Sequence, residues 1–247
     1  MARGNWGVSF VNRIPVADLI WGRLPTTLFV VGSSYLVALL IALPAGIISA
    51  VKQYSWLDNL ATTFAFLGYS LPTFFTGLLF ILIFTVKLGW LPEVYTTNIP
   101  ESGWRWALFM VRQAAMPVAV LAMFQAAELA RFVRASVLEV LHLDYVRTAR
   151  AKGLSERRVV TLHVVRNALI PVVTIMALQV PGIFTGALVT EQIFRVPGIG
   201  SLLITSILSN DTPVVMGVTF VYAALVVVFG LFADLLYGWL DPRISFR

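Results

Sequence analysis

The sequence contains no cysteine and only three lysines, and both absences limit its chemistry. Without cysteine the chain has no disulfide, no thiolate nucleophile and no thiolate metal site. The lysines are Lys52, Lys87 and Lys152, and none of them follows a glycine. A Walker A phosphate loop, which needs a glycine before its lysine, is therefore excluded. We expect that this chain does not hydrolyse nucleotides itself.

Charge is also scarce, because charged residues make up 12% of the 247 residues and hydrophobic residues 59%. This composition is typical of a polytopic membrane protein and excludes a water-soluble fold. A membrane-spanning helix needs about 20 apolar residues. The sequence predicts an all-α protein with five such helices, at 28–51, 60–86, 106–140, 167–190 and 212–240, of which the third is interrupted by charged residues. The segment before them has no compact apolar core of the kind that marks a cleaved signal peptide.

The net charge of +6 does not indicate a nucleic-acid partner, because the basic residues stand beside the predicted spans. They are concentrated in the segment 144–171, which also holds His163 and lies between two apolar runs. We expect Asp144 to cap a short helix over Tyr145–Lys152, which Gly153 ends in a left-handed conformation. Ser155 then caps a second helix with Glu156 in its first turn. From composition alone, this segment is a basic cytoplasmic loop beside anionic lipid.

The amino-acid sequence of this loop is more informative than its composition. The stretch Tyr145–Leu154 reads YVRTARAKGL, and His163 and the stretch Arg166–Pro171 follow it. It resembles the EAA loop of the inner-membrane permease subunits of binding-protein-dependent ABC importers, in the branch that handles dipeptides, oligopeptides and nickel. The chain departs from the broader consensus, with Arg-Thr-Ala at 147–149 in place of Glu-Ala-Ala and the proline displaced to Pro171. Both departures resemble sequence features of the peptide branch.

Other segments extend the resemblance over nearly the whole chain. The stretches 12–20 and 23–27 are similar to the lead-in of the B-type permease of the pair, and EQIFRVPGIG at 191–200 is similar to the signature after the family's fifth helix. The residues 234–237 and 241–243 match the family's carboxyl end. We therefore expect an extracytoplasmic lead-in segment at 1–27 and a transmembrane domain of the ABC importer type at 28–247.

The resemblance implies a coupling helix that docks in a cleft of an ATPase subunit. By position this role falls to Asp144, Tyr145, Arg147, Thr148, Ala149, Arg150, Ala151, Lys152 and Gly153. The residues that join the loop to the next helix are His163, Arg166, Asn167 and Pro171. Implied partners are a second homologous permease, two ABC ATPases and an extracytoplasmic substrate-binding protein. ATP and magnesium would bind to the ATPases, and this chain would hold no cofactor, no metal and no catalytic residue.

Candidate residues for a translocation pathway are Ser70, Pro72, Gln125 and Glu128. The stretch 68–72 interrupts a predicted span, where backbone groups need neighbours or water, although a plain packing kink explains it equally well. Glu128 and Arg131 are spaced as an i,i+3 pair near the end of a span. We expect these charges to extend to the membrane interface, with a pair inside the bundle as the alternative.

Membrane orientation follows from the loop. If 144–166 faces the cytoplasm of the cell and the chain lies in the inner membrane, eleven basic residues after position 27 lie inside and four outside, as the positive-inside rule requires. The carboxyl terminus is then inside and the amino terminus outside. Family members usually have one more helix before the region that aligns with Met1, so we expect that a first helix is missing here. A gradient-driven secondary transporter and a non-transporting scaffold are the alternative functions, and the sequence does not distinguish the cargo.

Overall fold

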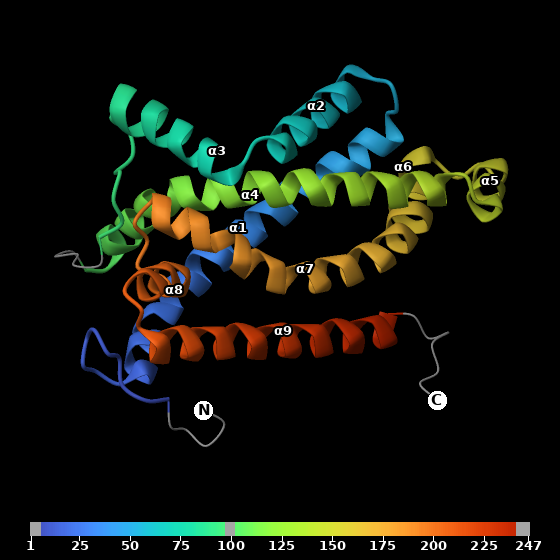
Figure 1. The fold of residues 1–247 in the computed structure, drawn as a ribbon. Coiled ribbons are helices and arrows are strands. Elements are labelled where there is room, and N and C mark those ends of the chain that lie inside the picture. The colour runs from blue at the N-terminus through green and yellow to red at the C-terminus, as the bar shows by residue number, and fades with distance from the viewer. Residues whose placement is uncertain (1–5, 97–101, 241–247) are drawn as a thin grey trace. The chain divides into compact units, whose positions relative to one another are not determined.

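The computed structural model describes residues 6–96 and 102–240, and most of these residues are helical. In chain order the helices are α1 (Val16–Val51), α2 (Trp56–Ser70), α3 (Thr73–Phe80), η1 (Ile81–Lys87), α4 (Trp104–Leu141), α5 (Asp144–Ala151), α6 (Glu156–Arg158), η2 (Val159–Val165), α7 (Arg166–Ile193), α8 (Ile199–Leu208) and α9 (Thr212–Leu240). Figure 1 follows them from blue to red. The two η elements are π-helical turns. The predicted all-α membrane fold is confirmed.

Among the described residues, four helices are long and apolar enough to cross a membrane, and α2 with the α3–η1 segment makes a fifth if this broken pair is one span. The break falls at Leu71 and Pro72, inside the stretch that the sequence marked as an interruption. Pro72 is the N-cap of α3, with an extended backbone. A proline suits this place because it has no N–H to leave unpaired.

The first helix begins at Val16 instead of the predicted Leu28, so the second half of the lead-in segment is helical. The structural reason is that Val16 and Ile20 are buried, one turn apart, among apolar side chains of α8 and α9. The decapeptide at 191–200 also leads into a helix, α8, that the sequence did not predict. Part of the matched carboxyl end lies outside the described residues, namely 241–243, and so do the side chains of Asp234, Leu236 and Tyr237.

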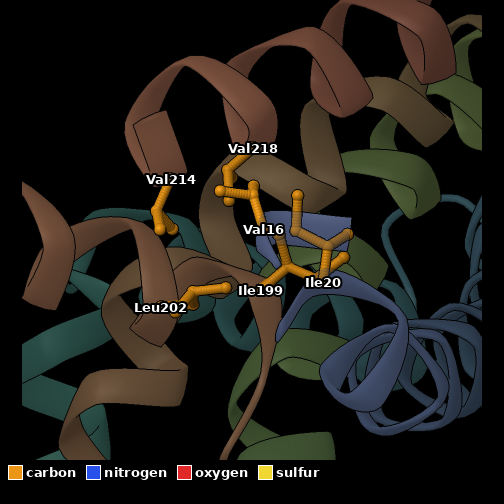
Figure 2. Packing of buried hydrophobic residues seen from close by; sticks show 6 residues of the cluster. All are labelled: Val16, Ile20, Ile199, Leu202, Val214 and Val218. Carbon is orange, nitrogen blue, oxygen red and sulfur yellow. The ribbon is translucent and has the colours of Figure 1, made fainter. Parts of the chain in front are cut away.

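The chain divides into two compact units. Unit 1 comprises residues 1–37, 71–122 and 181–228. Its apolar cluster is shown in Figure 2 and consists of Val16, Ile20, Ile199, Leu202, Val214 and Val218. The packing is close, because a Cβ atom added to Gly217 would lie 2.7 Å from Cγ1 of Val16.

The loop before α1 is also fixed within unit 1, by a carboxylate between α8 and α9. Asp211 is buried and accepts hydrogen bonds from the Ser9 hydroxyl and the backbone N–H groups of Phe10 and Val11. Burial alone would raise the pKa of this carboxyl, but the hydrogen bonds outweigh it and hold the pKa below its ordinary value.

Unit 2 comprises residues 38–70, 123–180 and 229–247 and contains the loop that the sequence singled out. Its helices α1 and α4 approach closely at Gly46, where an added Cβ atom would lie 2.7 Å from Cβ of Val133 and 2.8 Å from the Ala130 carbonyl oxygen. Pro44 stands two residues before Gly46 in the same helix. The structure gives this glycine a packing role, and α1 runs without interruption through both residues.

Candidate functional site

The short helix α5 begins one residue earlier than predicted. Leu143, with an extended backbone, occupies the N-cap position, and Asp144 is the first helical residue. The prediction that Asp144 caps this helix is therefore wrong, and no side-chain hydrogen bond caps it. The Asp144 carboxylate still lies in the first turn, where a negative charge suits the helix dipole. It lies 3.8 Å from the Arg147 guanidinium.

The end of α5 has the geometry that the sequence predicted. Lys152 is the C-cap and Gly153 has a φ of +77°, in the left-handed region that favours glycine. The N–H of Gly153 donates to the Arg150 carbonyl at 2.9 Å, and the N–H of Leu154 donates to the Ala149 carbonyl at 3.4 Å. These two bonds together form a Schellman motif. The direction in which the chain leaves α5 is therefore set by backbone hydrogen bonds.

One face of α5 is buried and the other is exposed. Val146 and Ala149, three residues apart, are buried, and α5 packs against η2, whose Val159 and Val164 are also buried. The exposed side chains of the predicted coupling set are Asp144, Tyr145, Arg147, Thr148, Arg150, Ala151 and Lys152. Figure 1 shows α5 beyond the carboxyl end of α4, with an axis that does not continue that of α4. The result is a short polar helix that is held on one side and open on the other.

A bidentate ion pair spans the glycine turn. Nε and Nη2 of Arg150 donate to the two carboxylate oxygens of Glu156 at 3.0 and 2.7 Å. Glu156 is the first residue of α6, and Ser155 is its N-cap, as predicted, although without a side-chain capping bond. The predicted coupling set includes both Arg147 and Arg150. The structure shows that Arg150 already has a partner within the loop, whereas the one ion-pair contact of Arg147 among the described residues is the 3.8 Å contact with the almost fully exposed Asp144.

The residues that join the loop to α7 meet at one carbonyl. The His163 carbonyl oxygen accepts hydrogen bonds from the Tyr145 hydroxyl at 3.3 Å and from Nδ2 of Asn167 at 2.7 Å. His163 lies in the π-helical turn η2, where the altered hydrogen-bond pattern leaves carbonyl groups open to such partners. Arg166 is the first residue of α7, and α7 continues through Pro171. The bonds from Tyr145 and Asn167 therefore connect α5 to the start of a long helix.

The predicted pathway residues are spread over both units. Ser70, Gln125 and Glu128 belong to unit 2 and Pro72 to unit 1. Glu128 and Arg131 are not among the ion pairs of the described residues, so the alternative of a pair inside the bundle is not formed there. The Arg131 guanidinium instead lies over the ring of Tyr69, 4.3 Å from its centroid. An aromatic ring face attracts a cation, which explains why Arg131 turns toward α2.

Sequence reasoning missed a buried polar cluster in unit 2. Asp58, in the first turn of α2, accepts hydrogen bonds from the Ser49 hydroxyl, the Tyr54 N–H and Nε and Nη2 of Arg134. The two Arg134 bonds measure 3.0 and 3.1 Å. The available signal was a single carboxylate in an otherwise apolar segment, since such a group needs a partner when it is buried. Arg134, in the carboxyl-terminal part of α4, is thus held by Asp58 of α2.

A second missed cluster, in unit 1, explains the decapeptide at 191–200. The Glu191 carboxylate is buried and accepts hydrogen bonds from the Thr27 hydroxyl at 2.7 Å and the Ser201 N–H at 2.9 Å. The Thr27 hydroxyl oxygen in turn accepts a bond from the Ile199 N–H at 2.8 Å. These N–H groups belong to the first turn of α8, where a helix has no backbone partners of its own to offer. The carboxylate lies so close that an added Cβ atom on Gly198 would be 2.1 Å from it.

The described part of the chain offers few side-chain groups that could bind a metal ion or a cofactor. Within it, no group of three or more histidine and acidic side chains is arranged to hold a metal ion. His142 has its Nδ1 atom 2.7 Å from the Leu138 carbonyl oxygen. What α5 and its surroundings offer is an exposed polar surface, which suits contact between proteins.

Comparison with known proteins identifies the family. The family model of the binding-protein-dependent transport system inner membrane component matches residues 42–246. The chain belongs to this family. It is 42% identical to the oligopeptide transport system permease protein AppB of Bacillus subtilis (strain 168), over 100% of this chain and 78% of AppB. It is 40% identical to the glutathione transport system permease protein GsiC of Escherichia coli (strain K12), over 99% of this chain and 76% of GsiC.

Solved structures agree on the fold. One, of an amino acid ABC transporter with histidines, gives a TM-score of 0.68 at 14% identity and covers 90% of this chain and 94% of the other. A second, the inward-facing MetNI methionine ABC transporter, gives 0.73 at 17% identity and covers 91% and 97%. At these identities the likeness concerns the fold alone. The prediction of an ABC importer permease of the peptide branch is confirmed by the family and by the relatives.

Proposed function

We propose that this permease forms half of a pathway that carries di- or oligopeptides across the inner membrane, driven by separate ATPase subunits. The observation that carries the proposal is the construction of α5. Its apolar face is buried against η2, its carboxyl end is fixed by the Schellman motif and by the Arg150–Glu156 pair, and its polar face is left open. A helix that must transmit movement needs a rigid connection on one side and a docking face on the other.

The exposed face of α5 has the positive charge expected of a surface that docks in an acidic cleft. Arg147 is 68% exposed in its side chain, and Lys152 is also exposed. Opposite charges across an interface guide association and fix its register. We therefore assign Arg147 and Lys152 as the basic contacts with the ATPase, and Arg150 as the residue that holds the turn. The second permease subunit and the extracytoplasmic binding protein complete the proposed assembly.

The orientation follows from the same assignment. If α5 meets a cytoplasmic ATPase, the spans α1, α2 to η1, and α4 precede it, so the residues before α1 lie on the extracytoplasmic side. Peptide cargo is supported by the two relatives, which are an oligopeptide transport system permease and a glutathione transport system permease. Nickel, the other cargo of this branch, has no such support among them. Transport proceeds by alternating access, in which ATPase closure moves α5.

Reconstitution of the permease pair with the ATPases and the binding protein in liposomes tests this function. We expect peptide uptake that requires ATP, with hydrolysis stimulated by the peptide-loaded binding protein. Uptake that follows a proton or sodium gradient without ATP would instead support a secondary transporter. Assembly with neither uptake nor stimulated hydrolysis would support a scaffold. Replacement of the peptide by nickel in the same assay distinguishes the two cargoes.

A further inference from the structure

A cavity of about 240 Å³ lies within unit 2, between helices α1, α2 and α4. Its walls are built from small side chains, namely Ala45, Gly46, Ala61, Ala65, Ala130 and Ala135. Small residues between membrane helices usually let the helices approach closely, as they do at Gly46. Here they also leave a half-open apolar space, which the helices themselves do not fill.

Two arginines of α4 line the same cavity. Arg131 forms no ion pair with the residues that the structure describes, and its contact with the Tyr69 ring leaves its charge unneutralised. Arg134 uses Nε and Nη2 to hold Asp58, while its Nη1 makes no hydrogen bond within the described chain. The hydroxyl groups of Ser49 and Thr62 also line the space. The cavity therefore combines apolar walls with the positive charge of Arg131 and with the Nη1 group of Arg134, which has no hydrogen-bond partner in the described chain.

The residues around the cavity place it at a membrane boundary. The turn between α1 and α2 follows Ser49 closely and carries Lys52 and Tyr54, and Trp56 begins α2 directly after it. Tyr54 is 88% exposed and Trp56 is 71% exposed. Exposed tyrosine and tryptophan beside a lysine mark the level of the lipid headgroups. A ligand in this cavity would thus have a polar end at the headgroups and an apolar end between the helices.

We propose that this cavity binds one anionic phospholipid, with its phosphate at Arg131 and Nη1 of Arg134 and the start of an acyl chain against the alanine walls. The charge of the phosphate complements that of Arg131, and a basic pocket between membrane helices is the form that such lipid sites take. That the lipid belongs to the cytoplasmic leaflet rests on the proposed function, because the proposed function takes the α5 loop to be cytoplasmic. The binding chemistry is independent of it.

Native mass spectrometry of the detergent-purified permease complex tests this site. The complex is incubated with phosphatidylglycerol or with phosphatidylcholine of the same chains, and the retained lipid is counted. We expect one phosphatidylglycerol to be retained in preference to phosphatidylcholine. Arg131→Gln removes the charge without touching Asp58 and should reduce retention about fivefold. Arg157→Gln is the matched control, because Arg157 is exposed on the α5–α7 loop and does not line the cavity.

A cavity-filling variant and a competition with inorganic phosphate complete the test. Ala61→Phe fills the apolar space and should also reduce retention, while size-exclusion chromatography confirms that each variant complex assembles. Inorganic phosphate should not displace the lipid. Equal retention of both lipids, or unchanged retention in Arg131→Gln, would overturn the proposal, and so would displacement by inorganic phosphate, which would reveal a soluble-anion site. The assay uses neither ATP nor peptide, so a failure of the proposed transport function would leave its result unaffected.

Discussion

Arg150 and Glu156 face each other across the Gly153 turn and share two hydrogen bonds of 3.0 and 2.7 Å. Both side chains are partly exposed, so the pair contributes at most about 1 kcal/mol to stability. Its larger effect is on geometry, because a bidentate pair fixes the angle between two short helices. The main role of Arg150 is therefore to fix the geometry of the loop, and contact with a partner is secondary.

The charge swap at these two positions separates the two roles of Arg150. Arg150→Glu alone should weaken ATPase binding, because it places two carboxylates across the turn. The double variant Arg150→Glu with Glu156→Arg restores an ion pair with reversed direction. If Arg150 acts through the turn, the double variant should recover most of the coupled ATPase activity. Failure to recover, with normal assembly in the membrane, would show that the Arg150 charge contacts the ATPase directly.

Gly153 and Gly89 form a matched pair for testing the turn. Both have a positive φ, +77° and +62°, and an added Cβ atom would meet nothing within 4 Å at either site. Valine at either position should therefore cost roughly 1–2 kcal/mol from backbone conformation alone. Gly153→Val should reduce stimulated ATP hydrolysis, whereas Gly89→Val, which lies in unit 1, should not. Equal losses in both variants would mean that the effect on hydrolysis is general destabilisation.

The Glu191 cluster is expected to hold unit 1 together. Glu191→Leu removes the acceptor for the Thr27 hydroxyl and the Ser201 N–H and leaves buried donors unpaired, which costs about 1–3 kcal/mol for each. The melting temperature of the purified complex should fall clearly. The neighbouring residue Gln192 is exposed, and within the described residues its side chain has only a long, exposed 3.4 Å bond from the Ser201 hydroxyl. Gln192→Leu is therefore the matched control, which makes the same apolar replacement without removing a buried acceptor. A melting temperature that is the same in both variants would contradict this role.

Asp211 predicts a pH dependence of stability. Burial raises the pKa of its carboxyl, but hydrogen bonds from Ser9 and from backbone N–H groups outweigh this effect, so the pKa lies below the ordinary 3.8. A carboxyl with a lowered folded pKa contributes stability above the unfolded pKa and loses it as the pH falls through the folded value. Wild type should therefore melt higher than Asp211→Asn at pH 6, and the difference should shrink below about pH 3.8. A difference that is constant with pH would exclude this linkage.

The sequence was sufficient for the loop but not for the buried clusters. Local signals determine the left-handed Gly153 and the N-cap of α6 at Ser155, because both depend on neighbours in the chain. The cap at Leu143 was missed because an aspartate suits both the cap and the first turn. Glu191 with Thr27, 164 residues apart, and Asp58 with Arg134 could not be paired from the sequence, since a buried carboxylate shows the need for a partner and not its identity.

The absence of cysteine makes the decisive measurement simple, since any introduced thiol is the sole thiol of this chain. Thr148→Cys places it on the exposed face of α5, and Asn12→Cys places the control in the exposed loop before α1. In right-side-out membrane vesicles that contain the assembled complex, a membrane-impermeant maleimide should label Asn12→Cys and leave Thr148→Cys unlabelled. In inside-out vesicles, a thiol-to-amine cross-linker on Thr148→Cys should capture an ATPase subunit, with a yield that changes when ATP is added. Labelling of Thr148→Cys from the outside, or no capture of the ATPase by an assembled complex, would contradict the coupling role of α5.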